Sequence, residues 1–437
     1  MSSPTGSAPF PPPFGPLEGL RVLESARFVA GPWAATYLAE FGARVIHIEG
    51  PPFGPPYADA TRSLRPLLAG DDPADRVSES WVQYARNKLS VGLDVRDAAG
   101  RAVFLDLVRA SDIWIESSRP GTYAKFGLSD EAVWEANPRL VIVHVSGHGQ
   151  TGEPSRVNAP SYDLTAQAFS GFLALQGEPD PRPPMRSGTA LNDTVTGLAA
   201  ATAGLMGYVC AQRTGRGQSV DVAQYEVFFI LLENLALDYF MRGVVRGRYG
   251  TAHPRLHPYD VHRAADGWVV VAAPTPESWR ALRALIGFPD AGYDDRDFRL
   301  AHREPVDRAI AEFCGSRSRD ELEALARAHD VAINRVPDIA ELARDPHYRA
   351  RGMFVEWDDP IAGRVRGAGV APRFSATPGG VWRGAPWLGQ DNDRVLGGVL
   401  GYSADRIERL RRDGVVGADP PKGPASSAAP FYRRGSS

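Results

Sequence analysis

The feature that most constrains the fold is an alternation of strand-like and helix-like segments that begins at residue 19. The pattern predicts a strand over residues 19–24, a helix over 32–41 and a second strand over 43–49. A strand, a helix and a strand in such a short stretch form a βαβ unit, and the two strands of such a unit lie parallel in one sheet.

The alternation continues to residue 145 with three more strands and two more helices. We expect the strands over residues 90–93, 112–116 and 140–145, and the helices over 98–110 and 130–137. This order favours a doubly wound, Rossmann-like α/β domain built on a parallel sheet.

A second, smaller α/β unit is predicted further along the chain. Two long helices are expected before it, one starting at about residue 194 and one running from about 219 to 242. The small unit itself opens with the turn Asp266-Gly267 and a strand over 268–271. Helices are expected in it over 276–286, 307–314 and 319–329, and a last helix over 403–413. We divide the chain into a flexible arm (1–16), a large domain (17–225), a linker helix and loop (226–257), a small α/β domain (258–336), a further segment (337–417) and a disordered tail (418–437).

Charge and cysteine content exclude several classes of protein. The 437 residues carry a net charge of −3, which gives no electrostatic reason to expect binding to nucleic acid or to an anionic membrane. The two cysteines, Cys210 and Cys314, form no CxxC motif, so we expect no disulfide framework and no cysteine-based zinc site, as in a cytoplasmic protein. Residues 194–212 carry no charge but are rich in Ala, Gly and Thr, which favours a buried helix over a membrane span.

The first βαβ turn does not fit a nicotinamide cofactor. It contains Ala30-Gly31-Pro32 in place of G-x-G-x-x-G, although Glu49 ends the second strand where a ribose-binding acid would lie. A nucleotide-binding fold without this fingerprint fits coenzyme A (CoA). His253, His257 and His262 predict no metal site either, because Pro254 and Pro258 interrupt any helix between them.

An ordered set of short motifs resembles a known family. The motifs lie at residues 19–49, 86–88, 116–121, 147–152, 162–171, 191–197, 214–218 and 266–268. Together they resemble the family III CoA-transferases, which include formyl-CoA and carnitine CoA-transferases and are related to the α-methylacyl-CoA racemases. The resemblance runs from about residue 17 to 416.

The resemblance implies that Asp193 is the catalytic nucleophile. A carboxylate can attack a thioester to give an acyl–aspartyl anhydride, from which the CoA thiolate forms an aspartyl–CoA thioester. The alternative is structural, because an aspartate at a helix start commonly caps the backbone.

The resemblance also implies where CoA binds. Phosphates favour helix N-termini and fixed cations, and the matching segments contain both. The implied CoA-binding residues are Phe28, Val29, Ala30, Arg86, Asn87, Lys88, Ser117, Ser118, Arg119 and Lys125. For each cation the alternative is a solvated surface charge.

At two positions the chain differs from particular members of the family that it resembles. Val29 occupies the place of a glutamine that shapes the oxalate site of formyl-CoA transferases, so we expect a bulkier or less polar acid. Tyr162 occupies the place of the histidine that racemases use, and a phenol with a pKa near 10 is a poor base at neutral pH. Tyr162 and His148 are candidates to line the acyl pocket, or else are structural.

The implied architecture is a large Rossmann-like domain completed by the C-terminal segment, a small α/β domain, and two chains interlocked like rings in a homodimer. The favoured function is transfer of CoA from an acyl-CoA donor to a carboxylic acid, with no metal and no nicotinamide. The alternatives are a 2-methylacyl-CoA racemase or epimerase and a non-catalytic CoA-binding protein.

Overall fold

The computed structural model describes residues 10–55, 57–64, 67–68 and 77–421. Most of the predicted arm and most of the predicted tail lie outside the described residues. The chain divides into two compact units. The first contains Met1–Ser170, Ser187–Glu233 and Arg351–Ser437, and the second contains Gly171–Arg186 and Asn234–Ala350.

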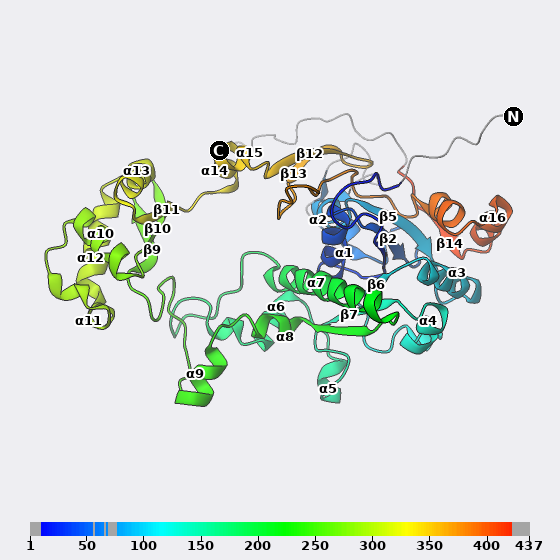
Figure 1. Cartoon of the computed structure of the whole chain (residues 1–437), viewed down its shortest axis with the longest axis horizontal. Helices are drawn as coiled ribbons and strands as arrows, with labels where there is room; N and C mark the ends of the chain where they lie inside the picture. The colour runs from blue at the N-terminus through cyan, green and yellow to red at the C-terminus, as the bar shows by residue number, and fades with distance from the viewer. Residues whose placement is uncertain (1–9, 56, 65–66, 69–76, 422–437) are drawn as a thin grey trace. The chain divides into compact units, whose positions relative to one another are not determined.

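A seven-stranded sheet forms the centre of the first unit, in the order β14-β5-β2-β1-β6-β7-β8 (Figure 1). The strands are β1 (Arg21–Glu24), β2 (Arg44–Glu49), β5 (Lys88–Leu93), β6 (Ile113–Glu116), β7 (Val141–Ser146), β8 (Ser219–Ala223) and β14 (Val416–Gly417). All neighbours pair in parallel except β14, which is antiparallel to β5. The strand order reverses between β1 and β6, as in doubly wound nucleotide-binding folds, so the predicted α/β architecture with a parallel sheet is confirmed.

Helices cover both faces of this sheet because its strands are apolar on both sides. Adjacent strand residues point to opposite faces: Leu23 packs in one core cluster and Val22 in the other. One face is covered by α1 (Ala30–Glu40) and α7 (Leu191–Thr214). The other is covered by α3 (Ala98–Arg109), α4 (Asp130–Ala136), α16 (Ala404–Arg412) and the π-helix Arg394–Val399.

Helix α7 lies unusually close to the sheet. A Cβ atom at Gly207 would lie 2.7 Å from Val141 Cγ1, and one at Gly204 would lie 3.3 Å from Val143 Cγ2. The small residues are therefore buried as expected, but the opposite side of α7 exposes Met206 and Val209. By length and composition alone α7 is apolar enough to cross a membrane, yet one side of it belongs to the packed core.

The second helix predicted over residues 219–242 is wrong. This stretch contains strand β8, helix α8 (Gln224–Phe229) and helix α9 (Leu235–Arg242). Val220 and Val222 alternate with polar residues, and β8 pairs with β7 and forms the edge of the sheet. Sheet pairing therefore outweighed the helical pattern of the apolar residues that follow.

Shorter elements complete the first unit. They are β3 (Leu67–Leu68), β4 (Val77–Ser78), α2 (Glu79–Tyr84), α5 (Pro154–Val157), α6 (Asp163–Phe169), β12 (Phe354–Asp359) and β13 (Gly363–Ala368).

The second unit contains an antiparallel sheet in the order β11-β10-β9, with a core that includes Trp279, Leu282, Ile310 and Leu322. Its helices and strands are α9, β9 (Tyr259–Ala264), β10 (Gly267–Ala272), α10 (Pro276–Ile286), α11 (Arg296–Ala301), α12 (Arg303–Gly315), α13 (Arg319–His329), β11 (Ala332–Arg335), α14 (Ile339–Arg344) and α15 (Pro346–Ala350). The helices predicted over 276–286 and 319–329 are confirmed with the same bounds.

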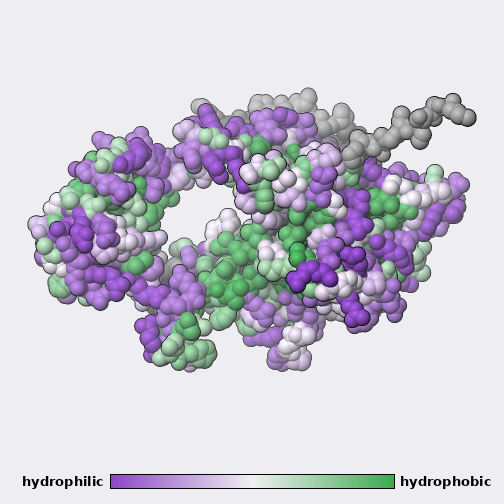
Figure 2. Space-filling model, in the orientation of Figure 1, coloured by the Kyte–Doolittle hydropathy of each residue, from purple (hydrophilic) through white to green (hydrophobic). Residues whose placement is uncertain are grey.

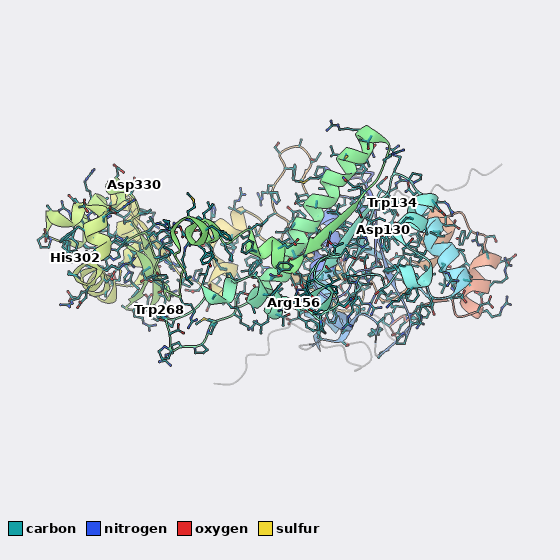
Figure 3. All side chains as sticks on the ribbon, turned by 90° about the horizontal axis from the view of Figure 1, so that it is seen from below. Asp130, Trp134, Arg156, Trp268, His302 and Asp330 are labelled. Atoms are coloured by element: carbon teal, nitrogen blue, oxygen red, sulfur yellow. The ribbon has the colours of Figure 1, made fainter. Side chains whose placement is uncertain are left out.

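A histidine joins three elements of the first unit. On β7, His144 Nδ1 lies 2.7 Å from Glu116 Oε1 at the end of β6, and Nε2 lies 3.2 Å from Asp130 Oδ2. Asp130 is the first residue of α4, one turn before Trp134 (Figure 3). Burial lowers the pKa of His144, but the hydrogen bonds to the two carboxylates outweigh it and raise the pKa to about 9.

This raised pKa predicts a pH-dependent contribution to stability. Because the folded pKa exceeds the unfolded value, the contribution of His144 is complete below pH 6.5 and is lost as the pH rises through 9. We expect His144→Asn to lower the free energy of unfolding by on the order of 2–3 kcal/mol at pH 6.5 and by much less at pH 9.5. Urea unfolding at both pH values measures the difference, and an equal loss at both would contradict this role.

Candidate functional site

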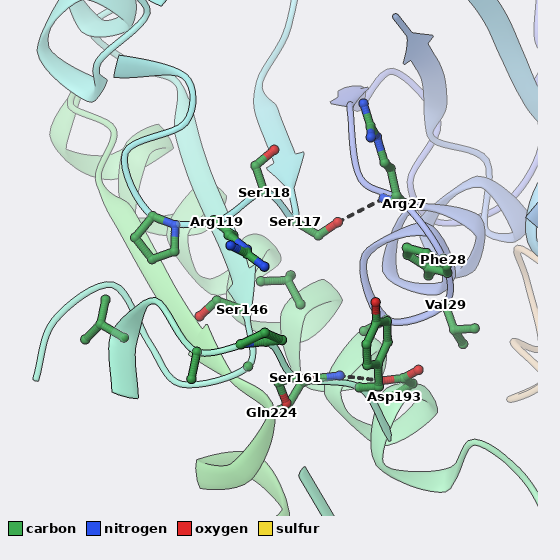
Figure 4. Close-up of a pocket in the computed structure, with 18 residues that line it drawn as sticks. Arg27, Phe28, Val29, Ser117, Ser118, Arg119, Ser146, Ser161, Asp193 and Gln224 are labelled. Carbon is green, nitrogen blue, oxygen red and sulfur yellow. Dashed lines mark hydrogen bonds between the residues drawn. The ribbon is translucent and has the colours of Figure 1, made fainter. Parts of the chain in front are cut away.

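A cavity of about 240 Å³ lies where the strand order reverses, at the carboxyl ends of β1 and β6 (Figure 4). Open α/β sheets place their ligands at this point because the connecting chains leave the sheet in opposite directions there. The lining residues come from the β1–α1 turn, the loops after β6 and β7, the segment before α6, and the first turns of α7 and α8. The sequence thus brings six separate segments to one site.

The β1–α1 turn has a conformation that its sequence would not favour. Phe28 has a φ of 64°, in the left-handed region that side chains with a Cβ rarely adopt. The backbone N–H of Arg27 donates to Ser117 Oγ at 2.9 Å, which ties this turn to the loop after β6. The ring of Phe28 meets the Tyr162 ring edge to face at 6.0 Å between centroids. Such strain persists where the surroundings fix it, and it is frequent at functional sites.

Asp193 lies in the first turn of α7 and lines the cavity, and one of its carboxylate oxygens accepts a hydrogen bond. Gln224 Nε2 donates to Asp193 Oδ1, and the backbone N–H of Asp193 donates to Asp163 Oδ1 at 3.2 Å (Figure 4 draws the first of these). In the described part of the chain, Oδ2 has no hydrogen-bond partner. Ala190, rather than Asp193, occupies the N-cap position of α7, so the capping alternative is wrong.

The surroundings make this carboxyl group unusually basic. Burial is the largest cause, and the nearby charge of Asp163 adds to it, while the hydrogen bond from Gln224 acts in the opposite direction. Together they raise the pKa of Asp193 from 3.8 to about 7. A carboxylate with such a pKa is a better nucleophile than an ordinary surface aspartate, and it is still substantially ionised at neutral pH.

A second cavity of about 170 Å³ adjoins the first, because Arg27 and Ser118 line both. The second is bounded by the end of β2 and by the rings of Tyr123 and Phe126. The guanidinium groups of Arg27 and Arg119 have no hydrogen-bond or ion-pair partner among the described residues. A long ligand with an anionic middle and an aromatic end matches this pair of cavities.

Most of the residues predicted for the site do meet at the first cavity. Those that line it are Phe28, Val29, Ala30, Ser117, Ser118, Arg119, Tyr162 and Asp193. Lys125 is exposed, between Ala124 and Phe126, and lines neither cavity. His148 packs in a cluster with the rings of Phe169 and Tyr225, next to the cavity-lining Gly147.

The predicted triplet of residues 86–88 lies inside the first unit. Arg86 pairs with Glu40, and Asn87 Nδ2 donates to the carbonyl of Gly380 at 2.7 Å. Lys88 is 1% exposed and donates to Glu24 and to a backbone carbonyl. None of the three lines either cavity, so a direct contact between these side chains and a ligand stays a prediction.

Three residues of the site were not predicted from the sequence: Arg27, Asp163 and Gln224. Gln224 was missed because it lay within the helix predicted over residues 219–242, whereas it directly follows strand β8. Arg27 precedes the predicted turn by one residue, and a strand end next to a helix N-terminus could have pointed to it.

Comparison with known proteins identifies the family to which the chain is similar. The model of CoA-transferase family III matches residues 17–392. A bile acid CoA-transferase of Clostridium scindens is 36% identical to this chain, over 93% of this chain and 90% of the relative. The α subunit of a succinyl-CoA–L-malate CoA-transferase of Chloroflexus aurantiacus is also 36% identical, over 92% of this chain and 92% of the relative. The crystal structure of a CAIB/BAIF family protein from Brucella suis superimposes with a TM-score of 0.77 at 30% identity, covering 89% of this chain and all of the other.

The raised pKa of Asp193 predicts that its ionised carboxylate lowers the free energy of unfolding of the native chain. The unfolded chain ionises Asp193 at a lower pH than the folded chain, so stability is lost as the pH rises from about 4 through 7. We expect Asp193→Asn to raise the free energy of unfolding by on the order of 2–4 kcal/mol at pH 8 and by little at pH 4.5. Urea unfolding of both forms is the measurement, with Asp297→Asn on the exposed side of α11 as the control. Equal stability of Asp193→Asn and the native chain at pH 8 would contradict the electrostatic account.

Proposed function

The chain belongs to CoA-transferase family III, and from this premise we propose that it moves CoA from an acyl-CoA thioester to a carboxylic acid through covalent intermediates on Asp193. The observation that carries the proposal is the Asp193 carboxylate itself. It is a partly buried group with a pKa raised to about 7, and one of its oxygens faces a cavity without a partner among the described residues.

The two adjoining cavities support a binding path for CoA. The adenine fits against Tyr123 and Phe126 in the second cavity, and the pyrophosphate fits beside Arg27, where the cavities meet. The pantetheine arm then extends into the first cavity and brings the thioester to Asp193. The N-terminus of α1 lies on this path, and the backbone N–H groups of its first two residues, Ala30 and Gly31, favour negative charge.

The reaction replaces one thioester of CoA by another through covalent bonds to Asp193, without hydrolysis. Asp193 Oδ2 attacks the thioester carbonyl and releases the CoA thiolate, which then attacks the Asp193 carbonyl and releases the first acid. The incoming acid reverses these two steps and leaves with the CoA. Exclusion of water matters because both covalent intermediates hydrolyse readily.

The wall of the first cavity supports a larger and less polar acid than oxalate. Val29, Val145 and Val157 contribute aliphatic surface, and Phe28 and Tyr162 contribute rings, while Arg119 offers a cation for a carboxylate. The relatives named above act on bile acids and on L-malate, so size alone does not define the family. We propose an acid with an extended apolar body for this chain.

The same lining argues against a racemase. Racemisation needs a second acid–base group opposite the aspartate, and no histidine lines the described part of the first cavity. Tyr162, at the sequence position of the racemase histidine, lines the cavity instead and is 63% exposed. Retention of a reactive carboxylate likewise argues against a protein that only binds CoA.

We further propose that two chains form the interlocked homodimer. Apolar residues gather on the exposed side of α7 and over α8 (Figure 2). Met206 is 66% exposed and Ile230 is 74% exposed, values that are costly for large apolar side chains in water. An obligate interface larger than about 2,000 Å² would cover them. Both cysteines are free thiols, which fits a cytoplasmic enzyme.

Asp193→Ala is expected to abolish CoA exchange, because the variant lacks the carboxylate that we propose as the carrier of the acyl group. We predict a loss of at least about 10³-fold, the range seen when a covalent nucleophile is removed. The assay incubates succinyl-, acetyl-, butyryl- and cholyl-CoA with a panel of carboxylic acids and follows the new thioesters. Hydroxylamine should convert Asp193 of the native chain to a hydroxamate, located by peptide mass analysis.

Asp297→Ala, on the exposed side of α11, is the matched control and should exchange at the native rate. Full activity of Asp193→Ala would refute the mechanism. Exchange of the substrate α-hydrogen with deuterium, without transfer, would instead support the racemase.

The homodimer has its own test. The double variant Met206→Asp/Ile230→Asp places two charges on the exposed apolar surface, and we expect it to be monomeric, as measured by light scattering during size-exclusion chromatography. Ala102→Asp, on the exposed side of α3 at the other face of the sheet, should leave the mass unchanged. A native chain that is monomeric at micromolar concentration would contradict the proposal.

A further inference from the structure

Gln224 is held on a rigid junction beside the proposed nucleophile. It is the first residue of α8, directly after β8, and is 8% exposed. Its side-chain amide donates to Asp193 Oδ1, and its backbone carbonyl accepts from Asn192 Nδ2 at 3.2 Å. Asn192 is fully buried. Two hydrogen bonds therefore fix the first turn of α7 against the end of β8, so the amide keeps its position relative to the carboxylate.

The covalent steps of the proposed function place charge on this same oxygen. When Oδ2 is acylated, Oδ1 becomes the carbonyl oxygen of the anhydride. The thiolate then attacks Cγ, the π electrons of the carbonyl move to Oδ1, and a tetrahedral oxyanion forms. The Cγ–S bond is formed in this attack. Collapse of the oxyanion restores the carbonyl at Oδ1 and breaks the Cγ–Oδ2 bond, and the acid leaves as a carboxylate, with Oδ2 as one of its oxygens, without any proton transfer. Attack by the incoming acid on the thioester passes through an oxyanion at Oδ1 again.

We propose that the side-chain amide of Gln224 is a catalytic group that stabilises the oxyanion on Asp193 Oδ1 whenever the aspartyl carbonyl is attacked. The inference rests on the proposed function and adds a residue to it. An oxyanion hole is usually built for the substrate carbonyl, but this reaction also needs one for the enzyme's own carbonyl.

A neutral amide suits this role better than a cation. In the resting carboxylate the charge is shared by two oxygens, whereas in the tetrahedral intermediate it is concentrated on Oδ1, so the hydrogen bond strengthens as the reaction proceeds. A cation bonded to the resting carboxylate would hold its pKa low and weaken its attack on the thioester. With Gln224 as the donor, burial and Asp163 still raise the pKa of Asp193 to about 7.

The proposal predicts that Gln224 accelerates only the steps in which the aspartyl carbonyl is attacked. Gln224→Met retains the length of the side chain and removes the donor. We expect anhydride formation at nearly the native rate, and formation of the aspartyl–CoA thioester slowed by about 10²–10³-fold, the usual effect of removing one oxyanion donor. The experiment mixes enzyme with succinyl-CoA in a single turnover, stops it with acid, and measures acyl and CoA adducts on the intact protein by mass. Gln212→Met, at the other end of α7, is the matched control and should behave as the native chain.

Gln224→Glu tests the role in a second way that does not depend on the fold of the methionine variant. Its carboxyl group can donate to Oδ1 only when protonated, so thioester formation should be slow at pH 8 and recover partly at pH 5.5. A purely structural role would not produce this recovery.

The outcomes separate the two proposals. If the native chain forms no adduct with any of the four donors, the proposed function fails. If the native chain forms the CoA adduct and Gln224→Met forms it equally fast, the role of Gln224 is refuted. Equal slowing of both covalent steps, or a pH profile of Gln224→Glu that matches the native one, would also refute it.

Discussion

The buried ion pair between Lys88 and Glu24 determines the position of the site. Lys88 Nζ lies 3.0 Å from Glu24 Oε2 and donates to the Pro32 carbonyl at 2.9 Å, so one ammonium group joins β5, the end of β1 and the first turn of α1. Both side chains are almost fully enclosed, and breaking such a pair leaves an uncompensated charge in the core. Burial raises the pKa of Glu24, but His47 and Lys88 outweigh it and keep the carboxylate ionised. The strained turn at Phe28 lies between Glu24 and Pro32, the two residues that Lys88 contacts.

From that turn the site is built outward by contacts between distant segments. Arg27 is bonded to the loop after β6, Phe28 meets Tyr162, and Asp193 is bonded both to Asp163 and to Gln224. Each contact joins a residue at one strand end or helix start to another, which is why the geometry is precise enough for a covalent reaction. The charge of Asp163 near the Asp193 carboxylate opposes stability, and the surrounding core offsets this cost, as is usual for reactive sites.

The fold could be predicted because its signal is local and repeated. Strands such as 43–49 and helices such as 276–286 were recognisable from period and length alone, and βαβ units allow few topologies. The stretch 219–242 could not be predicted, because an apolar run does not reveal whether a neighbouring strand will pair with it. The site was predicted in part: Asp193 and the β1–α1 turn followed from the family resemblance, whereas Gln224 had no sequence signal of its own.

The sequence by itself therefore determined the alternation of elements, the family, and the residue types available for the chemistry. Only the tertiary structure decided which of those residues act together. Lys88 and Arg119 look alike as cations next to a predicted strand, yet the packed sheet encloses one and leaves the other at a cavity. The physical reason is that burial and charge pairing depend on neighbours far apart in the chain, as with Asp193, whose pKa is set by its enclosure and by a carboxylate thirty positions away.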